Sequence, residues 1–165
     1  MKLKTEKKLI KRELLKPKHH IDTCIIIESM SRENTKLKVF CKKYLNLIGY
    51  KYRGCFSLPM VGEFFIKVLT ELKENSEKEL IFKSFYDLVE DKKINFYTPK
   101  LLSLPDKIMN LDNRIIYTDA SIVACAIEEK AILVTLDNDL LHNKKIEQEY
   151  HIKIKSPGDV ITSPF

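Results

Sequence analysis

The sequence predicts an α/β fold, a three-layer α/β/α sandwich in which helices cover both faces of a central parallel sheet. Short apolar segments alternate along the chain with longer segments of helical periodicity, which is the order typical of βα units. The short segments are almost continuously apolar, as strands buried on both faces are. With 165 residues, 44% of them hydrophobic, the chain is long enough for one domain around a single core.

Four segments have the composition of buried strands. β-branched or other apolar residues dominate them, and polar residues bound them. The expected strands are residues 21–27 (IDTCIII), 94–98 (INFYT), 131–135 (AILVT) and 152–154 (IKI).

The segments between these strands repeat apolar residues at intervals of three and four, which predicts helices. One helix should follow Ser31 and end at Gly49, and another should begin near Pro59, because proline suits a first turn and glycine a helix end. Ser103 resembles the cap of a further helix. The remaining helices are expected over residues 76–90, 119–129 and 138–150.

The excess positive charge lies at the N-terminus. Residues 1–18 contain eight Lys or Arg and two Glu, and the rest of the chain contains 21 basic and 21 acidic residues. We therefore divide the chain into a basic N-terminal arm or helix, residues 1–18, and a domain, residues 19–165. The arm is either a solvated or docked helix or a contact for RNA phosphates. The candidate RNA contacts are Lys7, Lys8, Lys11 and Arg12.

The four cysteines and the apolar segments bear on the compartment. No two cysteines form a C-x-x-C pair or share metal-ligand spacing with a histidine, so we expect reduced, buried thiols. The paired His19 and His20 precede the first expected strand and are expected to be ordinary polar residues. No segment approaches the roughly 20 apolar residues of a membrane helix. A cytoplasmic protein without a membrane contact is expected.

Carboxylates occupy the positions where parallel sheets place their sites, beyond the carboxyl ends of strands and at the starts of the following helices. They are Asp22, Glu63, Asp119, Asp137 and Asp139. Each has an ordinary alternative, since the three later aspartates could cap helices and the glutamate could be solvated. Asp22 is hardest to explain in this way, because an unpaired acid in an apolar strand costs several kcal/mol.

Carboxylates gathered at one edge would repel one another unless a cation neutralised them. Oxygen ligands without nearby His or Cys suit Mg²⁺ or Mn²⁺ better than zinc. Such a site would fit metal-assisted hydrolysis of a phosphodiester.

The order and spacing of these acids resemble the PIN domain family, which includes the VapC-like ribonucleases. The matching features are Asp22-Thr23 early in the chain, Glu63 after Ser-Leu-Pro, the Asp119 motif (DAxIxA) and Thr135-x-Asp137-x-Asp139. The resemblance implies that Asp22, Glu63, Asp119 and Asp137 surround the metal. It also implies that Thr23 and Thr135 orient a carboxylate or water, and that Asp139 is an additional acid.

This resemblance implies an endoribonuclease that depends on Mg²⁺ or Mn²⁺, either the toxin of a toxin–antitoxin pair or an RNA-processing enzyme. Its partners would be an RNA substrate, an antitoxin protein and a second copy of the chain. The basic arm is a departure, because many VapC-like toxins begin almost directly with their first strand. The alternative is a catalytically inactive PIN-like module that binds RNA or a protein partner.

Overall fold

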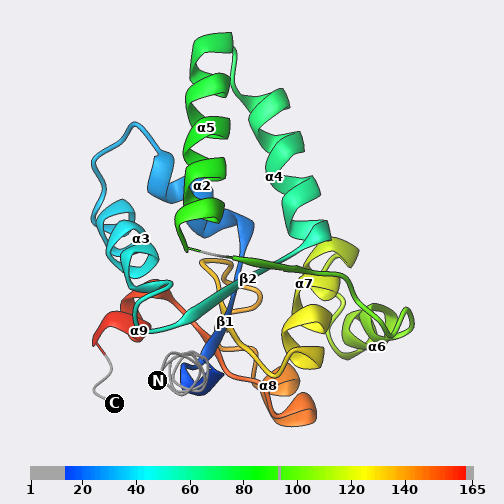
Figure 1. Cartoon of the computed structure of the whole chain (residues 1–165). Helices are drawn as coiled ribbons and strands as arrows, with labels where there is room; N and C mark the ends of the chain where they lie inside the picture. Colours follow the sequence, from blue (N-terminus) through cyan, green and yellow to red (C-terminus); the bar gives the residue numbers. More distant parts are fainter. Residues whose placement is uncertain (1–13, 93, 163–165) are drawn as a thin grey trace, which may run out of the picture.

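Five parallel strands form the centre of the computed structural model, which describes residues 14–92 and 94–162 (Figure 1). Along the sheet the strands follow the order β3-β2-β1-β4-β5. In this sheet, His20 of β1 pairs with Cys55 of β2 on one side and with Leu133 of β4 on the other. The strands are β1 (Lys18–Ile21), β2 (Arg53–Ser57), β3 (Asn95–Tyr97), β4 (Ile132–Val134) and β5 (Ile154–Lys155).

Helices flank this sheet and confirm the predicted α/β/α architecture. Helix α7 packs on β1, β2 and β4, with α6 against its outer side, while α3 packs against α2 and α9. The helices are α2 (Thr23–Met30), α3 (Lys36–Leu47), α4 (Leu58–Glu71), α5 (Asn75–Lys92), α6 (Leu104–Leu111), α7 (Tyr117–Glu128), α8 (Lys144–Tyr150) and α9 (Pro157–Thr162). Gly49 follows α3 with a φ of 78°, the left-handed conformation that favours glycine.

The strand predicted at residues 21–27 is wrong. Strand β1 ends at Ile21, Asp22 is extended, and α2 begins at Thr23. A short run of isoleucines does not distinguish a buried strand from a buried helix by periodicity. Ile25 and Ile26 are fully buried, so packing outweighs the weak preference of β-branched residues for strands.

The first strand is instead formed by Lys-His-His-Ile, and its two histidines are core residues. His19 stacks on Tyr52, with ring centroids 4.0 Å apart, and its Nδ1 lies 3.2 Å from the Tyr44 hydroxyl. The Nδ1 atom of His20 lies 3.5 Å from Cys55 Sγ. Burial lowers the pKa of His19 to about 4 and of His20 to about 3, so both are neutral at pH 7. The expectation of ordinary polar residues is therefore wrong.

The structure differs from the prediction at one further helix start and in two elements that were not predicted. Helix α8 begins at Lys144 instead of residue 138, because Asn143 caps it by accepting a hydrogen bond from the Ile146 amide. Strand β2 and helix α9 were not predicted. Strand β2 is short and contains Gly54, and glycine is uncommon in strands, so its composition does not indicate a strand.

Helices α4 and α5 form an antiparallel pair that projects from the sheet (Figure 1). Aromatic rings join them: Phe64 stacks on Phe85 with centroids 4.5 Å apart, and Phe65 stacks on Phe82 at 4.9 Å. Offset stacking of buried rings adds about 1 kcal/mol per pair to the area they bury. This packing fixes the first turns of α4, which carry Glu63.

Candidate active site

The sheet order brings the predicted acids to one edge. Strands β1 and β4 are neighbours, so Asp22 after β1 and Thr135 after β4 emerge side by side at their carboxyl ends. Asp119 lies in the first turn of α7, which packs on both strands. Glu63 lies in α4, which packs against α7. Three separate parts of the chain thus bring the carboxylates of Asp22, Asp119 and Glu63 to the carboxyl edge, where parallel sheets place their sites.

Asp22 is buried, with 5% of its surface exposed, and does not cap the helix that it precedes. One carboxylate oxygen, Oδ2, accepts hydrogen bonds from the Thr135 hydroxyl at 2.6 Å and from Cys24 Sγ at 3.2 Å. Burial raises the pKa of Asp22, and these hydrogen bonds oppose the rise. Thr135 therefore fixes the orientation of Asp22 across the β1–β4 boundary.

Thr23 and Lys67 together hold the Glu63 carboxylate. The Thr23 hydroxyl lies 2.7 Å from Glu63 Oε2 and 3.2 Å from the Met60 carbonyl. Since a hydroxyl carries one proton, the shorter contact with the carboxylate is the stronger candidate for its donated bond. Lys67 Nζ lies 2.6 Å from Glu63 Oε1. Glu63 is thus oriented by both neighbours and is not a freely solvated side chain.

Burial and neighbouring negative charges strongly perturb the pKa of Asp119. Its pKa rises to about 7, first because of burial and then because Asp22, Asp137 and Glu63 repel its negative charge. Lys67 opposes this rise. The helix cap of α7 is Ile116, so Asp119 does not serve as the cap that its position suggested. A half-buried acid facing three other acids is a common feature of functional sites.

Asp137 and Asp139 take different directions after β4. The Asp137 amide donates to Thr135 Oγ1 at 2.9 Å, and Asp137 Oδ1 accepts from the Asp139 amide at 2.7 Å. Asp139 is exposed, and its Oδ1 lies 3.4 Å from Nη1 of Arg114. Neither residue caps α8. Asp137 thus faces the acid edge, while Asp139 faces an arginine outside it.

A second polar cluster, not predicted from the sequence, adjoins Asp139. Arg114 donates from Nε to Asp112 Oδ1 at 3.0 Å and from Nη2 to Oδ2 at 2.6 Å. The Asn143 amide also donates to Asp112 Oδ2, at 3.1 Å. Hydrogen bonds from Arg114 hold the pKa of Asp112 well below its usual range. The D-x-R spacing suggests the first contact, but Asn143 reaches the cluster only through the fold.

The donor chemistry at the carboxyl edge fits a hard divalent cation, because the neighbouring groups are carboxylates whose repulsion a cation would relieve. In the side-chain positions of the described residues, however, no three His, Cys, Asp or Glu groups are arranged to hold one ion. Glu63 is directed toward Lys67 instead. Binding of a shared ion would therefore require side-chain movement.

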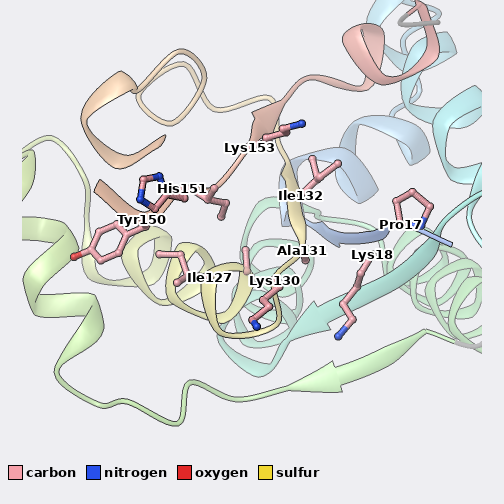
Figure 2. A pocket seen from close by; sticks show the side chains of 11 residues that line it. Pro17, Lys18, Ile127, Lys130, Ala131, Ile132, Tyr150, His151 and Lys153 are labelled. Carbon is pink, nitrogen blue, oxygen red and sulfur yellow. The ribbon is translucent and has the colours of Figure 1, made fainter. Parts of the chain in front are cut away.

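A cavity of about 610 Å³ lies at the opposite, amino edge of the sheet (Figure 2). Lys18 begins β1, and the loops before β4 and β5 contribute Lys130, His151 and Lys153. None of the residues that line this cavity is acidic. Glu129, beside it in the chain, pairs with Lys18 at 2.6 Å. The two edges of the sheet thus carry opposite charge.

Two further expectations concern the membrane and the arm. No helix within residues 14–92 and 94–162 is long and apolar enough to cross a bilayer. Lys7, Lys8, Lys11 and Arg12 lie outside the described residues, so their proposed contact with RNA stays a prediction. Lys18, placed at the end of the arm, begins β1. All four cysteines are described and are free thiols, as expected.

Solved structures share this fold. The crystal structure of FitAcB from Neisseria gonorrhoeae aligns with a TM-score of 0.61 and 17% identity, over 85% of this chain and 98% of that one. For VapBC2 from Rickettsia felis bound to a DNA fragment from their promoter, the TM-score is 0.62 and the identity 15%, over 84% and 98%. VapBC-1 from nontypeable Haemophilus influenzae aligns with a TM-score of 0.58 and 19% identity, over 86% of this chain and 98% of that one. Curated proteins gave no match.

Fold and site together define an α/β protein with carboxylates at the carboxyl edge of a parallel sheet. The family model of the PIN domain matches residues 20–146, well over half of the chain. The chain therefore belongs to the PIN domain family, a family of nucleases, as its acid pattern predicted. The match includes all five predicted acids.

Proposed function

We propose that this protein is an endoribonuclease that hydrolyses RNA phosphodiester bonds with Mg²⁺ or Mn²⁺. The observation that carries the proposal is the environment of Asp119, whose pKa is raised to about 7 first by burial and then by the charges of Asp22, Asp137 and Glu63. Repulsion between these carboxylates destabilises the folded protein. A bound cation would neutralise it, so the site should attract a cation.

In this proposal, the metal lies among the four acids Asp22, Glu63, Asp119 and Asp137. Thr135 orients Asp22, and Thr23 orients Glu63, through the hydrogen bonds of 2.6 and 2.7 Å. Asp139 is an additional acid at the rim of the site, held by Arg114. A divalent ion bound there would supply an activated water and neutralise charge on the phosphate.

The experiment is a cleavage assay with purified protein. Single-stranded or structured RNA should be cut with Mn²⁺ or Mg²⁺, and EDTA should stop the reaction. Asp119→Asn keeps the shape of the side chain and removes its charge, so cleavage should fall at least about 100-fold. Cleavage that persists both in EDTA and in Asp119→Asn would exclude this function.

We extend the proposal to a toxin held inactive by an antitoxin protein, acting on RNA in the cytoplasm as a homodimer. The structural neighbours that are named VapBC complexes support such a partner. Co-expression with the adjacent gene tests the pairing: an antitoxin would copurify with the chain and suppress its RNA cleavage. An RNA-processing enzyme would remain active without such a partner.

A second candidate function is an inactive PIN-like module that binds RNA, and the cavity at the amino edge favours it. Its lining includes Lys18, Lys130 and Lys153 and no acid. Lys18 is the last residue of the segment 1–18, whose sequence carries a net charge of +6. Lysines that neutralise RNA phosphates release the counterions condensed on the RNA, so binding would weaken steeply with salt.

Charge reversal separates this module from the nuclease. The double variant Lys130→Glu, Lys153→Glu should lower RNA affinity about tenfold and flatten the salt dependence. Lys83→Glu on the exposed side of α5 is the matched control. If the protein is an inactive module, Asp119→Asn would leave RNA binding intact, and neither the wild type nor this variant would cleave RNA.

A further inference from the structure

Lys67 lies where a cation would be expected beside Glu63. Its ammonium nitrogen is 2.6 Å from Oε1, while Oε2 accepts from the Thr23 hydroxyl at 2.7 Å. Both oxygens of Glu63 therefore already have a partner. The pair is partly shielded, with side-chain exposures of 37% for Lys67 and 22% for Glu63, so solvent weakens its attraction less than that of a fully exposed pair.

The charge of Lys67 also reaches the rest of the carboxyl edge. Desolvation opposes the charged form of Lys67, but the Glu63 contact and the negative charges of Glu63 and Asp22 outweigh it, so the pKa of Lys67 is raised. The same ammonium lowers the pKa of Asp119. Arg114 is directed elsewhere, to Asp112 and Asp139. Lys67 is thus a cation built into the acid site.

An ammonium and a divalent ion compete at this position. A magnesium ion approaches carboxylate oxygens to about 2.0–2.1 Å, so an ion on Oε1 of Glu63 would have to displace Lys67 or stand beside its positive charge. Asp22, Asp119 and Asp137 carry no such pairing with a lysine or arginine among the described contacts. An ion that drew these three side chains together would leave Glu63 paired with its lysine.

We propose that Lys67 is a tethered counter-ion that takes the place of a divalent ion at Glu63, so that the site holds a single Mg²⁺ or Mn²⁺ through Asp22, Asp119 and Asp137. This inference rests on the proposed function and specifies its metal count. Lys67 then positions Glu63, and Glu63 is not a metal ligand in the wild-type protein.

The test is titration of the full chain with Mn²⁺, read by calorimetry and by the electron paramagnetic resonance of free Mn²⁺. Wild type should bind one ion per chain. Lys67→Met keeps the aliphatic stem without the charge, and it should bind two ions, the first about tenfold more tightly. Lys67→Arg retains the cation and should bind one.

Two controls separate this effect from general changes of charge and fold. Lys144→Met removes a lysine from the exposed pair with Glu147 in α8 and should leave one ion bound with unchanged affinity. Glu63→Gln should also leave one ion bound, because Glu63 is paired with Lys67. Circular dichroism of each variant verifies that it is folded.

Two ions in the wild type, or an unchanged count and affinity in Lys67→Met, would overturn the role of Lys67 and leave the metal-dependent nuclease standing. A loss of the single ion in Glu63→Gln would also overturn it. No specific Mn²⁺ binding in the wild type would overturn the proposed function and this inference together.

Discussion

Asp112 and Asp119 lie on either side of the segment that enters α7, yet their surroundings are opposite. Asp112 accepts hydrogen bonds from Arg114 and Asn143, and Arg114 holds its pKa well below the usual range. Asp119 faces Asp22, Asp137 and Glu63, and burial and repulsion raise its pKa to about 7. The negative charge of Asp112 is paired with an arginine of the protein, whereas that of Asp119 faces other negative charges.

This difference separates structural from functional use of the same side chain. A carboxylate with its own arginine stabilises the fold and has no need of a further cation. A carboxylate surrounded by carboxylates destabilises the fold until something positive binds. The comparison therefore assigns Asp112 to architecture and Asp119 to the proposed metal chemistry, and matched substitutions can break that assignment.

The largest expected effect comes from two isosteric changes. Asp119→Asn should lower RNA cleavage at least about 100-fold without loss of stability, because it removes repulsion. Asp112→Asn should lower the urea midpoint of unfolding, because Arg114 loses its charged partner, while folded protein retains cleavage. The measurements are cleavage rates with Mn²⁺ and urea unfolding. Equal losses of activity per folded molecule would contradict the comparison.

The next effect is the pH dependence of stability in EDTA. The folded pKa of Asp119, about 7, exceeds the ordinary value of 3.8 for an aspartate, so the folded state binds more protons between these values. Stability from this group is present at low pH and is lost as pH rises toward 7. Asp119→Asn should therefore match wild type near pH 4 and exceed it by about 1 kcal/mol near pH 8, after solvent screening.

His19 and His20 contribute the opposite slope in both proteins. Their folded pKa values, about 4 and about 3, lie below the ordinary value of 6.5 for a histidine, so they destabilise the fold as pH falls below 6.5. This contribution cancels when wild type and Asp119→Asn are compared at each pH by urea unfolding. A difference that shrinks with rising pH would refute the repulsion at Asp119.

The smallest expected effect is at Asp139. Its carboxylate is exposed and lies 3.4 Å from Arg114, so Asp139→Asn should change stability by less than about 0.5 kcal/mol and cleavage by less than about threefold. Asp137→Asn, at the acid edge, should lower cleavage far more. Parallel cleavage assays compare the two, and equal losses would place Asp139 among the essential acids.

The fold class and the order of the acids could be predicted because both depend on local patterns. Apolar strands, helical periodicity and acids at strand ends are visible in the chain itself. The roles of these acids and their metal remain proposals. The isoleucine run after Asp22 was misassigned because a short apolar run fits a buried strand and a buried helix equally. The burial of His19 and His20 was not predicted, because it depends on contacts with Tyr44, Tyr52 and Cys55 that only the fold creates.

Contacts between distant segments account for most of what the sequence could not predict. Arg114 meets Asp139, and Asn143 meets Asp112, only because α6, α7 and the turn after β4 converge. The Lys67–Glu63 pair has the i, i+4 spacing of an ordinary ion pair on a helix surface. Its position among the acids follows from the packing of α4 on α7.

The most direct test of the metal site is a crystal structure of the protein with Mn²⁺, with the ion located by its anomalous scattering. The account predicts a manganese ion at the carboxyl edge of the sheet, bound by oxygens of Asp22, Asp119 and Asp137, with the Asp112–Arg114 pair unchanged. Carboxylates that stay apart, with no manganese between them at saturating concentration, would contradict it.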